Sequence, residues 1–419
     1  MASWGYRPRI ADTELNRRLE GAGAVVVEGP KACGKTETAR QAAASEVLLD
    51  TDVASREAAA IDPALILDGK VPRLIDEWQA MPTIWNHVRR AVDERHEPGQ
   101  FILAGSAVPA DDHTRHSGAG RFSRLRMRPM SLFESGASDG SISLSSLLAG
   151  KPGRAADRGM TLEVLSEEIV RGGWPGFRNA SLDTAMQLVA DYLSDICRAD
   201  IQAVDSVARD PRRLRRLLHS LGRNVATSAA LTTLARDTAE DGTSLATHTI
   251  ARYLRSLERL YIVEDQPAWE PHLRSRVNLR RSPKRHLVDP SLAVAALGAD
   301  PQALMRDLNL LGLLFESLVV RDLRIYSQPI DRRVCHYRDN KGLEVDAIVE
   351  GRGVWGAFEV KLGGEKATEN AAAALLKFAR KIDTDKVGEP ATLAVIVATG
   401  YGYVRQDGVQ VIPIGALGP

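Results

Sequence analysis

Residues 24–36 decide the fold of this chain: Ala24-Val25-Val26-Val27-Glu28 is followed directly by Gly29-Pro30-Lys31-Ala32-Cys33-Gly34-Lys35-Thr36. The short run of β-branched side chains is typical of a buried parallel strand. The residues after it match the phosphate-loop pattern Gly-x-x-x-x-Gly-Lys-Ser/Thr at every position, and the segment from Glu37 onward is typical of a helix. Strand, glycine loop and helix in this order are the context that the pattern needs.

The chemistry of such a loop is specific. Gly29 and Gly34 let the backbone turn so that successive N–H groups point into one concavity, at the positive end of a helix dipole. Lys35 can reach the β- and γ-phosphates, and the Thr36 hydroxyl can ligate Mg²⁺. The sequence therefore predicts a nucleoside triphosphate site with Mg²⁺. Its predicted contacts are Gly29, Pro30, Lys31, Ala32, Cys33, Gly34, Lys35, Thr36 and Glu37. A glycine turn that only connects a strand to a helix is the alternative.

Length and composition indicate a globular protein of several domains. The chain has 419 residues, with 44% hydrophobic and 26% charged side chains and a net charge of +1. These values are those of soluble proteins with sizeable cores. Cys33, Cys197 and Cys335 lie far apart without metal-type spacing, which suits a reducing compartment. No signal pattern or membrane-length apolar run is visible, so the expected location is the cytoplasm.

A second motif lies downstream of the phosphate loop. Residues 71–79 form an apolar strand that ends in Asp76 and Glu77, the arrangement known as Walker B. In such sites the first carboxylate holds Mg²⁺ and the second orients or deprotonates the attacking water. We assign Asp76 and Glu77 to these two roles. A solvated turn is the alternative for an Asp-Glu pair at a strand end.

Two further residues are predicted at the catalytic site. Ser106 ends the apolar strand over residues 101–106, where a polar residue can sense the γ-phosphate or the water; a helix or turn cap is the alternative. Arg121 opens a basic stretch over residues 120–128 and is a candidate arginine finger, acting in cis or in trans. A basic surface strand is the alternative for this stretch.

The middle of the chain has the pattern of a winged helix. Residues 135–159 are rich in Ser, Gly and Asp and are expected to be a loop or linker. Helices are expected over 209–223, 231–237 and 247–259, with a strand over 261–265. Residues 271–286 then hold six basic residues and no acid: Arg274, Arg276, Arg280, Arg281, Lys284 and Arg285. Such a segment can bind DNA phosphates. An intramolecular packing module is the alternative.

A separate group of charged residues lies near the C-terminus. Asp346 is expected late in one strand, and Glu359 and Lys361 lie on one face of the next strand because side chains alternate. With Glu316 on the preceding helix, this is the layout of a restriction-endonuclease-like core. The acids could hold Mg²⁺ or Mn²⁺ and Lys361 could stabilise developing charge, which would make a nuclease. A core of this kind that serves only as a binding module is the alternative.

Several stretches together resemble one family. They are the phosphate loop, Ile75-Asp76-Glu77, Arg171-Gly172-Gly173-Trp174-Pro175, Asp289-Pro290, Tyr337-Arg338-Asp339, Glu344-Val345-Asp346 and Glu359-Val360-Lys361. Over nearly its whole length the chain looks like the bacterial and archaeal AAA-type ATPases that end in a domain of unknown function (number 4143). Members often carry tryptophan where this chain has Ala32, a position without a required chemical role. The resemblance implies ATP as the nucleotide.

The expected fold class is α/β multidomain: a P-loop parallel-sheet ATPase domain, a helical or winged-helix middle, and a small restriction-endonuclease-like α/β domain. The expected bounds are 1–137 for the ATPase core, 138–208 for a linker and helical segment, 209–300 for the winged helix and 301–419 for the last domain. The expected function is Mg²⁺-dependent ATP hydrolysis coupled to the other domains, acting on a partner such as DNA. A nucleotide-gated switch with little turnover and an ATP-regulated nuclease are the rivals. A protein partner and a homo-oligomer stay open.

Overall fold

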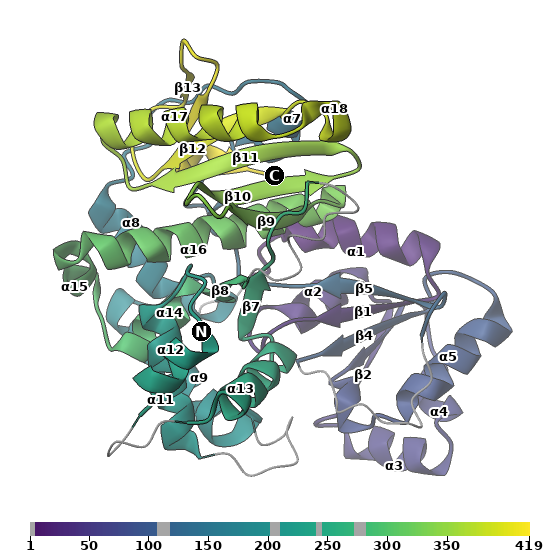
Figure 1. Cartoon of the computed structure of the whole chain (residues 1–419). Helices are drawn as coiled ribbons and strands as arrows, with labels where there is room; N and C mark the ends of the chain where they lie inside the picture. Colours follow the sequence, from purple (N-terminus) through teal and green to yellow (C-terminus); the bar gives the residue numbers. More distant parts are fainter. Residues whose placement is uncertain (1–4, 107–117, 202–209, 240–244, 272–281) are drawn as a thin grey trace.

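The computed structural model describes residues 5–106, 118–201, 210–239, 245–271 and 282–419 (Figure 1). The N-terminal part is built on a five-stranded parallel sheet in the order β2-β3-β4-β1-β5. Its strands are β1 (Ala24–Glu28), β2 (Ser45–Leu48), β3 (Arg73–Asp76), β4 (Phe101–Gly105) and β5 (Phe122–Arg126). The β-branched residues of β1 alternate between two cores, one on each face of the sheet. Helices α1 (Ile10–Gly21) and α2 (Lys35–Ala42) cover one face, and α3 (Val53–Ile61), α4 (Ala64–Leu67) and α5 (Ile84–Arg95) cover the other.

The strand register brings the sequence motifs to one edge of this sheet. Glu28 pairs with Gly105, and Asp76 pairs with Ala104. Because the strands are parallel, the segments that follow β1, β3 and β4 all leave at the same edge. The phosphate loop, the Asp76–Glu77 pair and Ser106 therefore meet there.

The middle of the chain is helical. Its helices are α8 (Leu162–Arg171), α9 (Leu182–Asp195) with a π-helical extension (Ile196–Asp200), α11 (Pro211–Arg223), α12 (Leu231–Asp237), α13 (Thr247–Arg259), α14 (Pro290–Leu297) and α15 (Pro301–Arg306). A two-stranded antiparallel hairpin, β7 (Val263–Gln266) and β8 (Lys284–Leu287), follows α13. In α11 the arginines alternate with leucines that are buried at helical spacing, as the sequence predicts.

The C-terminal part is a six-stranded mixed sheet in the order β13-β14-β12-β11-β10-β9. Its strands are β9 (Arg333–Arg338), β10 (Glu344–Gly351), β11 (Val354–Lys361), β12 (Thr392–Val397), β13 (Tyr403–Val404) and β14 (Gln410–Pro413). Helix α17 (Glu365–Lys381) covers one face, and α16 (Leu308–Ser327) lies against the other (Figure 1). The fold is thus mixed α/β, with a parallel-sheet unit, a helical middle and a mixed-sheet unit.

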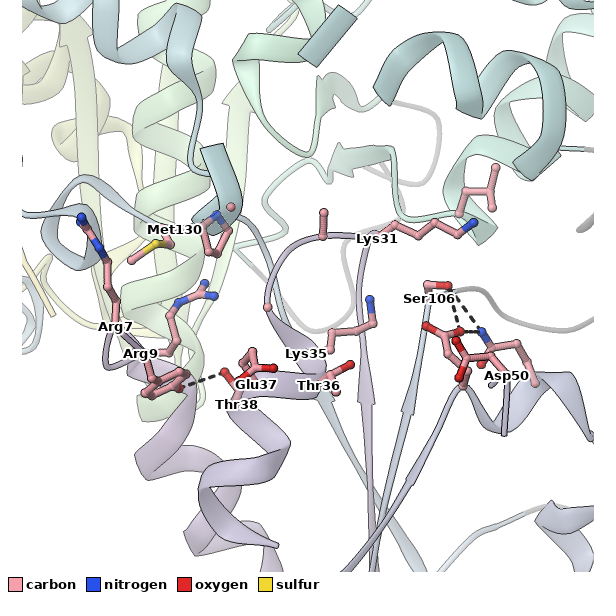
Figure 2. A pocket seen from close by; sticks show the side chains of 18 of the residues that line it. Arg7, Arg9, Lys31, Lys35, Thr36, Glu37, Thr38, Asp50, Ser106 and Met130 are labelled. Atoms are coloured by element: carbon pink, nitrogen blue, oxygen red, sulfur yellow. Dashed lines mark hydrogen bonds between the residues drawn. The ribbon is translucent and has the colours of Figure 1, made fainter. Parts of the chain in front are cut away.

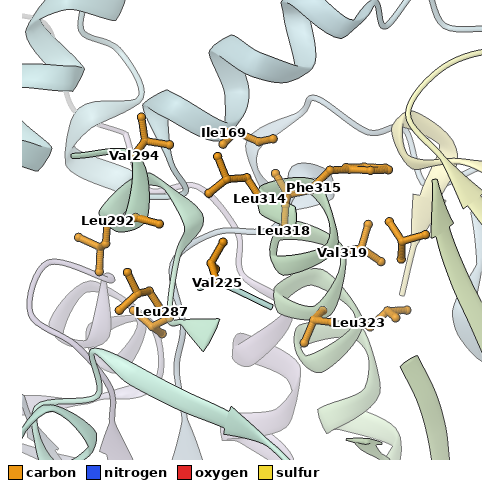
Figure 3. Packing of buried hydrophobic residues seen from close by; sticks show 14 of the residues in the cluster. Ile169, Val225, Leu287, Leu292, Val294, Leu314, Phe315, Leu318, Val319 and Leu323 are labelled. Carbon is orange, nitrogen blue, oxygen red and sulfur yellow. The ribbon is translucent and has the colours of Figure 1, made fainter. Parts of the chain in front are cut away.

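Helix α16 joins the middle to the C-terminal sheet. Figure 3 shows Leu314, Phe315 and Leu318 of α16 packed beside Ile169 of α8, within one hydrophobic cluster. The same cluster includes Phe358 on β11 of the C-terminal sheet. We therefore propose that the expected division at residue 300 separates two architectures that share one continuous core.

The segment expected to be a linker over residues 135–159 is instead packed into that core. It contains β6 (Ile142–Ser143) and α7 (Leu144–Leu148), and β6 pairs in parallel with β15 (Leu417–Gly418) near the C-terminus. Leu144 and Leu147 are completely or almost completely buried. The prediction of a loop was wrong because the serine-rich composition is typical of loops, whereas the leucines within it form a short buried helix. Among the described residues, no helix has the length and apolar character needed to cross a bilayer.

Candidate functional site

The phosphate loop is an open curve between β1 and α2. Gly29 packs so closely that a Cβ there would lie 2.3 Å from the backbone oxygen of Met127. Gly34 has φ +99°, and Ala32 also lies in the left-handed region at +59°. Positive φ values of this kind let successive N–H groups turn into one concavity, a geometry that suits an anion.

Lys35 and Thr36 begin α2 directly behind this curve. The Lys35 side chain folds over the loop, with Nζ 2.8 Å from the backbone oxygen of Pro30. Thr36 Oγ1 donates to both carboxylate oxygens of Asp76, at 3.1 and 3.0 Å. Burial raises the pKa of Asp76, the Thr36 hydrogen bond lowers it, and the neighbouring Glu77 charge raises it further. A hydroxyl and a buried carboxylate side by side are oxygen ligands that fit Mg²⁺, which would favour the ionised carboxylate.

Glu77 and Ser106 form the other side of the site. Glu77 has φ +49° and directly follows the last residue of β3, and its carboxylate accepts a hydrogen bond from Gln79. Ser106 Oγ is buried and lies 3.4 Å from both Glu77 Oε2 and Gln79 Nε2. Figure 2 shows Ser106 across the pocket from Lys35 and Thr36. The predicted base and the predicted sensor are therefore in mutual contact.

These residues line a cavity of about 1080 Å³. Its floor is the phosphate loop, with Thr36, Glu77 and Ser106. Its other walls come from the N-terminal segment, from the turn after α8, and from the end of the π-helix: Gly5, Tyr6, Arg7, Arg9, Pro175, Gly176, Asn179 and Asp200. The volume is at the upper end of that of ligand sites in proteins. The cavity lies between the parallel-sheet unit and the helical middle.

The outer part of the phosphate loop is tied to the helical middle. Lys31 Nζ lies 2.6 Å from Asp200 Oδ1 at the end of the π-helix, and the Lys31 carbonyl accepts a hydrogen bond from Tyr192. Cys33 is buried beneath the loop, whereas Glu37 pairs with Arg40 on the surface of α2 and also borders the cavity. Of the predicted contacts, Lys31, Ala32, Gly34, Lys35, Thr36 and Glu37 line the cavity directly.

Arg121 lies away from this site. It precedes β5, and Phe122 pairs with Ala24 at the N-terminal ends of the strands, the edge opposite the phosphate loop. Its guanidinium contacts Asp93 of α5 at 2.7 Å. The expectation of a finger acting in cis is therefore wrong, because strand polarity places Arg121 at the far end of the sheet. A role in trans stays a prediction.

Arg9 is the arginine that the structure brings to the loop. It is buried, and it donates to the carbonyl of Cys33 at 2.7 Å and to that of Arg128 at 2.8 Å. It also pairs with Glu134 at 3.0 Å. Sequence reasoning missed Arg9 because its partners lie 24 and more residues away in the chain.

The second group of predicted residues also comes together, at the middle of the C-terminal sheet. Lys361 Nζ lies 2.7 Å from Glu359 Oε2 and 3.3 Å from Asp346 Oδ2, and Asp346 Oδ2 accepts from the Val360 N–H at 2.9 Å. Glu316 projects from α16 toward the same place. A residue not predicted there, Lys284 of β8, lies 2.6 Å from Glu316 Oε1.

The acids of this group have shifted pKa values. Burial, reinforced by the Asp346 charge, raises the pKa of Glu316 to about 8 and that of Glu359 to about 7. Burial also acts on Asp346, but Lys284 and Lys361 outweigh it and hold the pKa of Asp346 below its ordinary value. Among the described residues, no three acidic, His or Cys side chains are grouped as a metal ion requires. In this conformation the carboxylates of Glu316, Asp346 and Glu359 are not arranged as ligands of a divalent ion.

The basic segment expected over residues 271–286 is only partly described. Arg274, Arg276, Arg280 and Arg281 lie outside the described residues. Lys284 is buried among acids, and Arg285 donates to the backbone oxygen of Ala229 and lies 3.9 Å from Asp265. Burial among acids leaves Lys284 unavailable to DNA, and Arg285 is held by contacts within the protein, so DNA contact by this segment stays a prediction for its other arginines.

The fold and the first site together define a P-loop nucleotide-binding protein. Residues 22–135 match the family model described as an AAA domain, and residues 311–417 match a domain of unknown function (DUF4143). Residues 162–303 match a further domain of unknown function (DUF8612). The chain therefore carries an AAA domain near its N-terminus and a DUF4143 domain near its C-terminus, as the sequence motifs predict.

Similar proteins include two uncharacterized mycobacterial proteins, Rv2008c of Mycobacterium tuberculosis and Mb2031c of Mycobacterium bovis. Each is 26% identical over 358 residues, which cover 84% of this chain and 73% of the relative. Among solved structures, the Walker-type ATPase PABY2304 of Pyrococcus abyssi aligns over 70% of this chain and 99% of its own, with 14% identity and a TM-score of 0.42.

Proposed function

We propose that the chain is an Mg²⁺-dependent ATPase. The observation that carries the proposal is the contact of Thr36 with both oxygens of Asp76, beside Lys35 and the glycine loop. The assignment of ATP rather than GTP is supported by the AAA domain match. The phosphate loop itself contacts only the phosphates, so it does not distinguish ATP from GTP.

In this mechanism the chain's own residues bind the polyphosphate and position the water. Lys35 and the loop N–H groups hold the β- and γ-phosphates. Thr36 and Asp76 would hold Mg²⁺, which neutralises charge on the phosphate oxygens. Glu77 accepts the proton of the attacking water, and Ser106, in contact with Glu77, keeps that carboxylate and the water in position.

The test is phosphate release by the purified full chain with ATP or GTP and Mg²⁺. Lys35→Ala and Glu77→Gln should both abolish release, and Glu77→Gln should still bind ATP. Lys70→Ala and Glu57→Gln are matched controls, because both residues are exposed on the same unit and outside the cavity. Equal background from wild type and the two site variants would reject catalysis. Retained ATP binding in that case would favour the nucleotide-gated switch.

We further propose that binding and hydrolysis of the nucleotide are coupled to the helical middle. We interpret this part of the chain as a winged helix. The order α11, α12, α13, β7, β8 supports this reading. Exposed arginines on α11 and α13 would supply the DNA contact: Arg212, Arg213, Arg215, Arg252 and Arg255. Fluorescence anisotropy with duplex DNA should give salt-sensitive binding. Arg252→Ala with Arg255→Ala should lower the salt slope by about 2, and Arg90→Ala on α5 should leave it unchanged. Salt-insensitive or absent binding would reject the contact.

A metal-dependent nuclease is the second candidate function. It is favoured by the gathering of Glu316, Asp346, Glu359 and Lys361 from a helix and two strands. Nicking of plasmid DNA with Mn²⁺ tests it, and any nicking should disappear with Asp346→Ala. Cutting that persists unchanged in that variant would come from another source.

A further inference from the structure

The hairpin β7–β8 is held firmly against the C-terminal sheet. The side-chain amide of Gln266, the last residue of β7, donates to the backbone oxygens of Cys335 and Asp346 at 3.0 and 2.9 Å. Ala268 forms a β-bridge with His336 on β9. Lys284 begins β8 opposite Gln266, so this docking directs Lys284 into the acidic group.

Lys284 Nζ occupies the centre of the carboxylates. It lies 2.6 Å from Glu316 Oε1, 2.8 Å from Glu344 Oε1 and 3.4 Å from Asp346 Oδ1, and its side chain is only 3% exposed. Lys361 neutralises the other side, where it contacts Glu359 and Asp346. Each of the four carboxylates therefore has a lysine partner.

The same oxygens are those that a divalent ion would need. Mg²⁺ is bound by oxygens at about 2.0–2.1 Å, and it carries two positive charges. An ammonium that is already within hydrogen-bond distance of these carboxylates takes both their lone pairs and the space between them. It would also repel an incoming cation, strongly so in a buried site.

We propose that Lys284 is the resident cation of this group and excludes divalent ions as long as the β7–β8 hairpin is docked. Removal of its ammonium frees the oxygens of Glu316, Glu344 and Asp346, the three carboxylates that it contacts, for a Mg²⁺ or Mn²⁺ ion. The inference is independent of the proposed ATPase activity. It states the condition under which the nuclease candidate can operate.

The experiment is a Mn²⁺ titration of the full chain, followed by electron paramagnetic resonance of free Mn²⁺ without nucleotide. All proteins carry Asp76→Asn, which removes the metal-binding carboxylate of the other site. The parent should bind no Mn²⁺ at this group. Lys284→Met, which keeps the length of the side chain, should gain a Mn²⁺ site. Lys386→Met is the matched control, because Lys386 pairs with Asp383 on the surface of the same unit.

Addition of Asp346→Asn to Lys284→Met should abolish the gained site. Mn²⁺ should also raise the unfolding temperature of Lys284→Met and leave the parent unchanged. Binding by the parent that Asp346→Asn removes would overturn the proposal, and this measurement needs no Lys284 variant to fold. A folded Lys284→Met protein that gains no site would overturn it as well. Gained binding without plasmid nicking would support the proposal and reject the nuclease candidate.

Discussion

The hydroxyl of Thr36 donates to both oxygens of the Asp76 carboxylate, at 3.1 and 3.0 Å, and so joins the first turn of α2 to the end of β3. Forty residues separate the two in the chain. They meet because parallel strands end at one edge of the sheet, and β4 alone lies between β1 and β3. The geometry of the sheet thus determines the contact between Thr36 and Asp76, and the contact does not require a ligand.

This contact predicts that the hydroxyl, more than the size of the side chain, decides Mg²⁺-dependent binding. Thr36→Val keeps the shape and removes the oxygen, and it should weaken the affinity for Mg·ATP by about tenfold or more. Thr36→Ser should stay close to wild type. Calorimetry with and without Mg²⁺ checks this, because binding without the metal should change less. Wild-type affinity of Thr36→Val for Mg·ATP would contradict the assignment.

Ser106 should matter for turnover more than for binding. Its Oγ lies 3.4 Å from both Glu77 Oε2 and Gln79 Nε2, so its loss frees the carboxylate that positions the water. Ser106→Ala should lower kcat by roughly tenfold with little change in ATP affinity. Steady-state phosphate release and equilibrium binding measure the two quantities. Ser141→Ala, at an exposed position, is the control; a turnover equal to wild type in Ser106→Ala would favour the alternative, a helix or turn cap, for Ser106.

The phosphate loop and the Asp76–Glu77 pair could be predicted from the sequence because each is a continuous stretch next to a strong strand pattern. Their placement at one edge follows from strand polarity alone. Arg121 was misplaced for the same reason: it stands at the beginning of its strand, whereas the site lies at the strand ends. The sequence shows the strand and its direction but does not show that it pairs in parallel with β1, which places Arg121 at the opposite edge of the sheet.

Lys284 and Arg9 could not be predicted because their roles depend on distant partners. In the sequence, Lys284 belongs to a run of basic residues that is typical of an exposed surface. In the structure it is buried against Glu316 and Glu344, 32 and more positions away. Similarly, only the tertiary fold brings Arg9 between Cys33 and Glu134.

The buried pair of Arg9 and Glu134 should contribute to stability as well as to the loop. Arg9→Met would leave Glu134 buried without its cation, and it should lower the free energy of unfolding by about 3–5 kcal/mol. Arg9→Met with Glu134→Gln should recover part of the loss. Arg7→Met is the control, because Arg7 is exposed and donates hydrogen bonds to the uncharged Ser135 carbonyl and Asn179 side chain. Urea unfolding of the full chain measures each value, and an unchanged Arg9→Met would contradict the prediction.

The same pair predicts a pH dependence. Burial opposes ionisation of Glu134, but Arg9 and the N–H groups of Ser131 and Ile10 outweigh it and hold the pKa of Glu134 below its ordinary value of 4.5. A lowered carboxyl pKa gives stability that is fully present above the unfolded-state value and is lost as the pH falls through the folded-state value. The stability difference between wild type and Glu134→Gln should therefore be constant from pH 7 to pH 5 and shrink below about pH 4.5. A difference that grows on acidification would contradict this.

Arg321 of α16 is the centre of a buried ionic network beside the nucleotide cavity. It contacts Asp289 at 2.8 Å and Asp322 at 2.7 Å, and both aspartates are completely buried. Asp289 accepts from the N–H of Gly173, which begins the turn that carries Pro175 and Gly176 into the cavity wall. Asp322 accepts from the N–H of Leu132, close to the end of the parallel-sheet unit. One side chain therefore links the turn after α8, which forms a cavity wall, to the segment around Leu132.

Removal of Arg321 should weaken both the fold and the nucleotide site. Arg321→Met keeps the bulk and leaves two buried carboxylates unpaired, so the free energy of unfolding should fall by about 3–5 kcal/mol. Because the turn after α8 then loses its anchor, Mg·ATP should also raise the unfolding temperature less than in wild type. Arg306→Met, at an exposed position of α15, is the control. If Arg321→Met is less stable but keeps the full shift with Mg·ATP, the network supports the core alone. A smaller rise in the unfolding temperature with Mg·ATP would show that Arg321 of α16 supports the cavity wall and, through it, the affinity for the nucleotide.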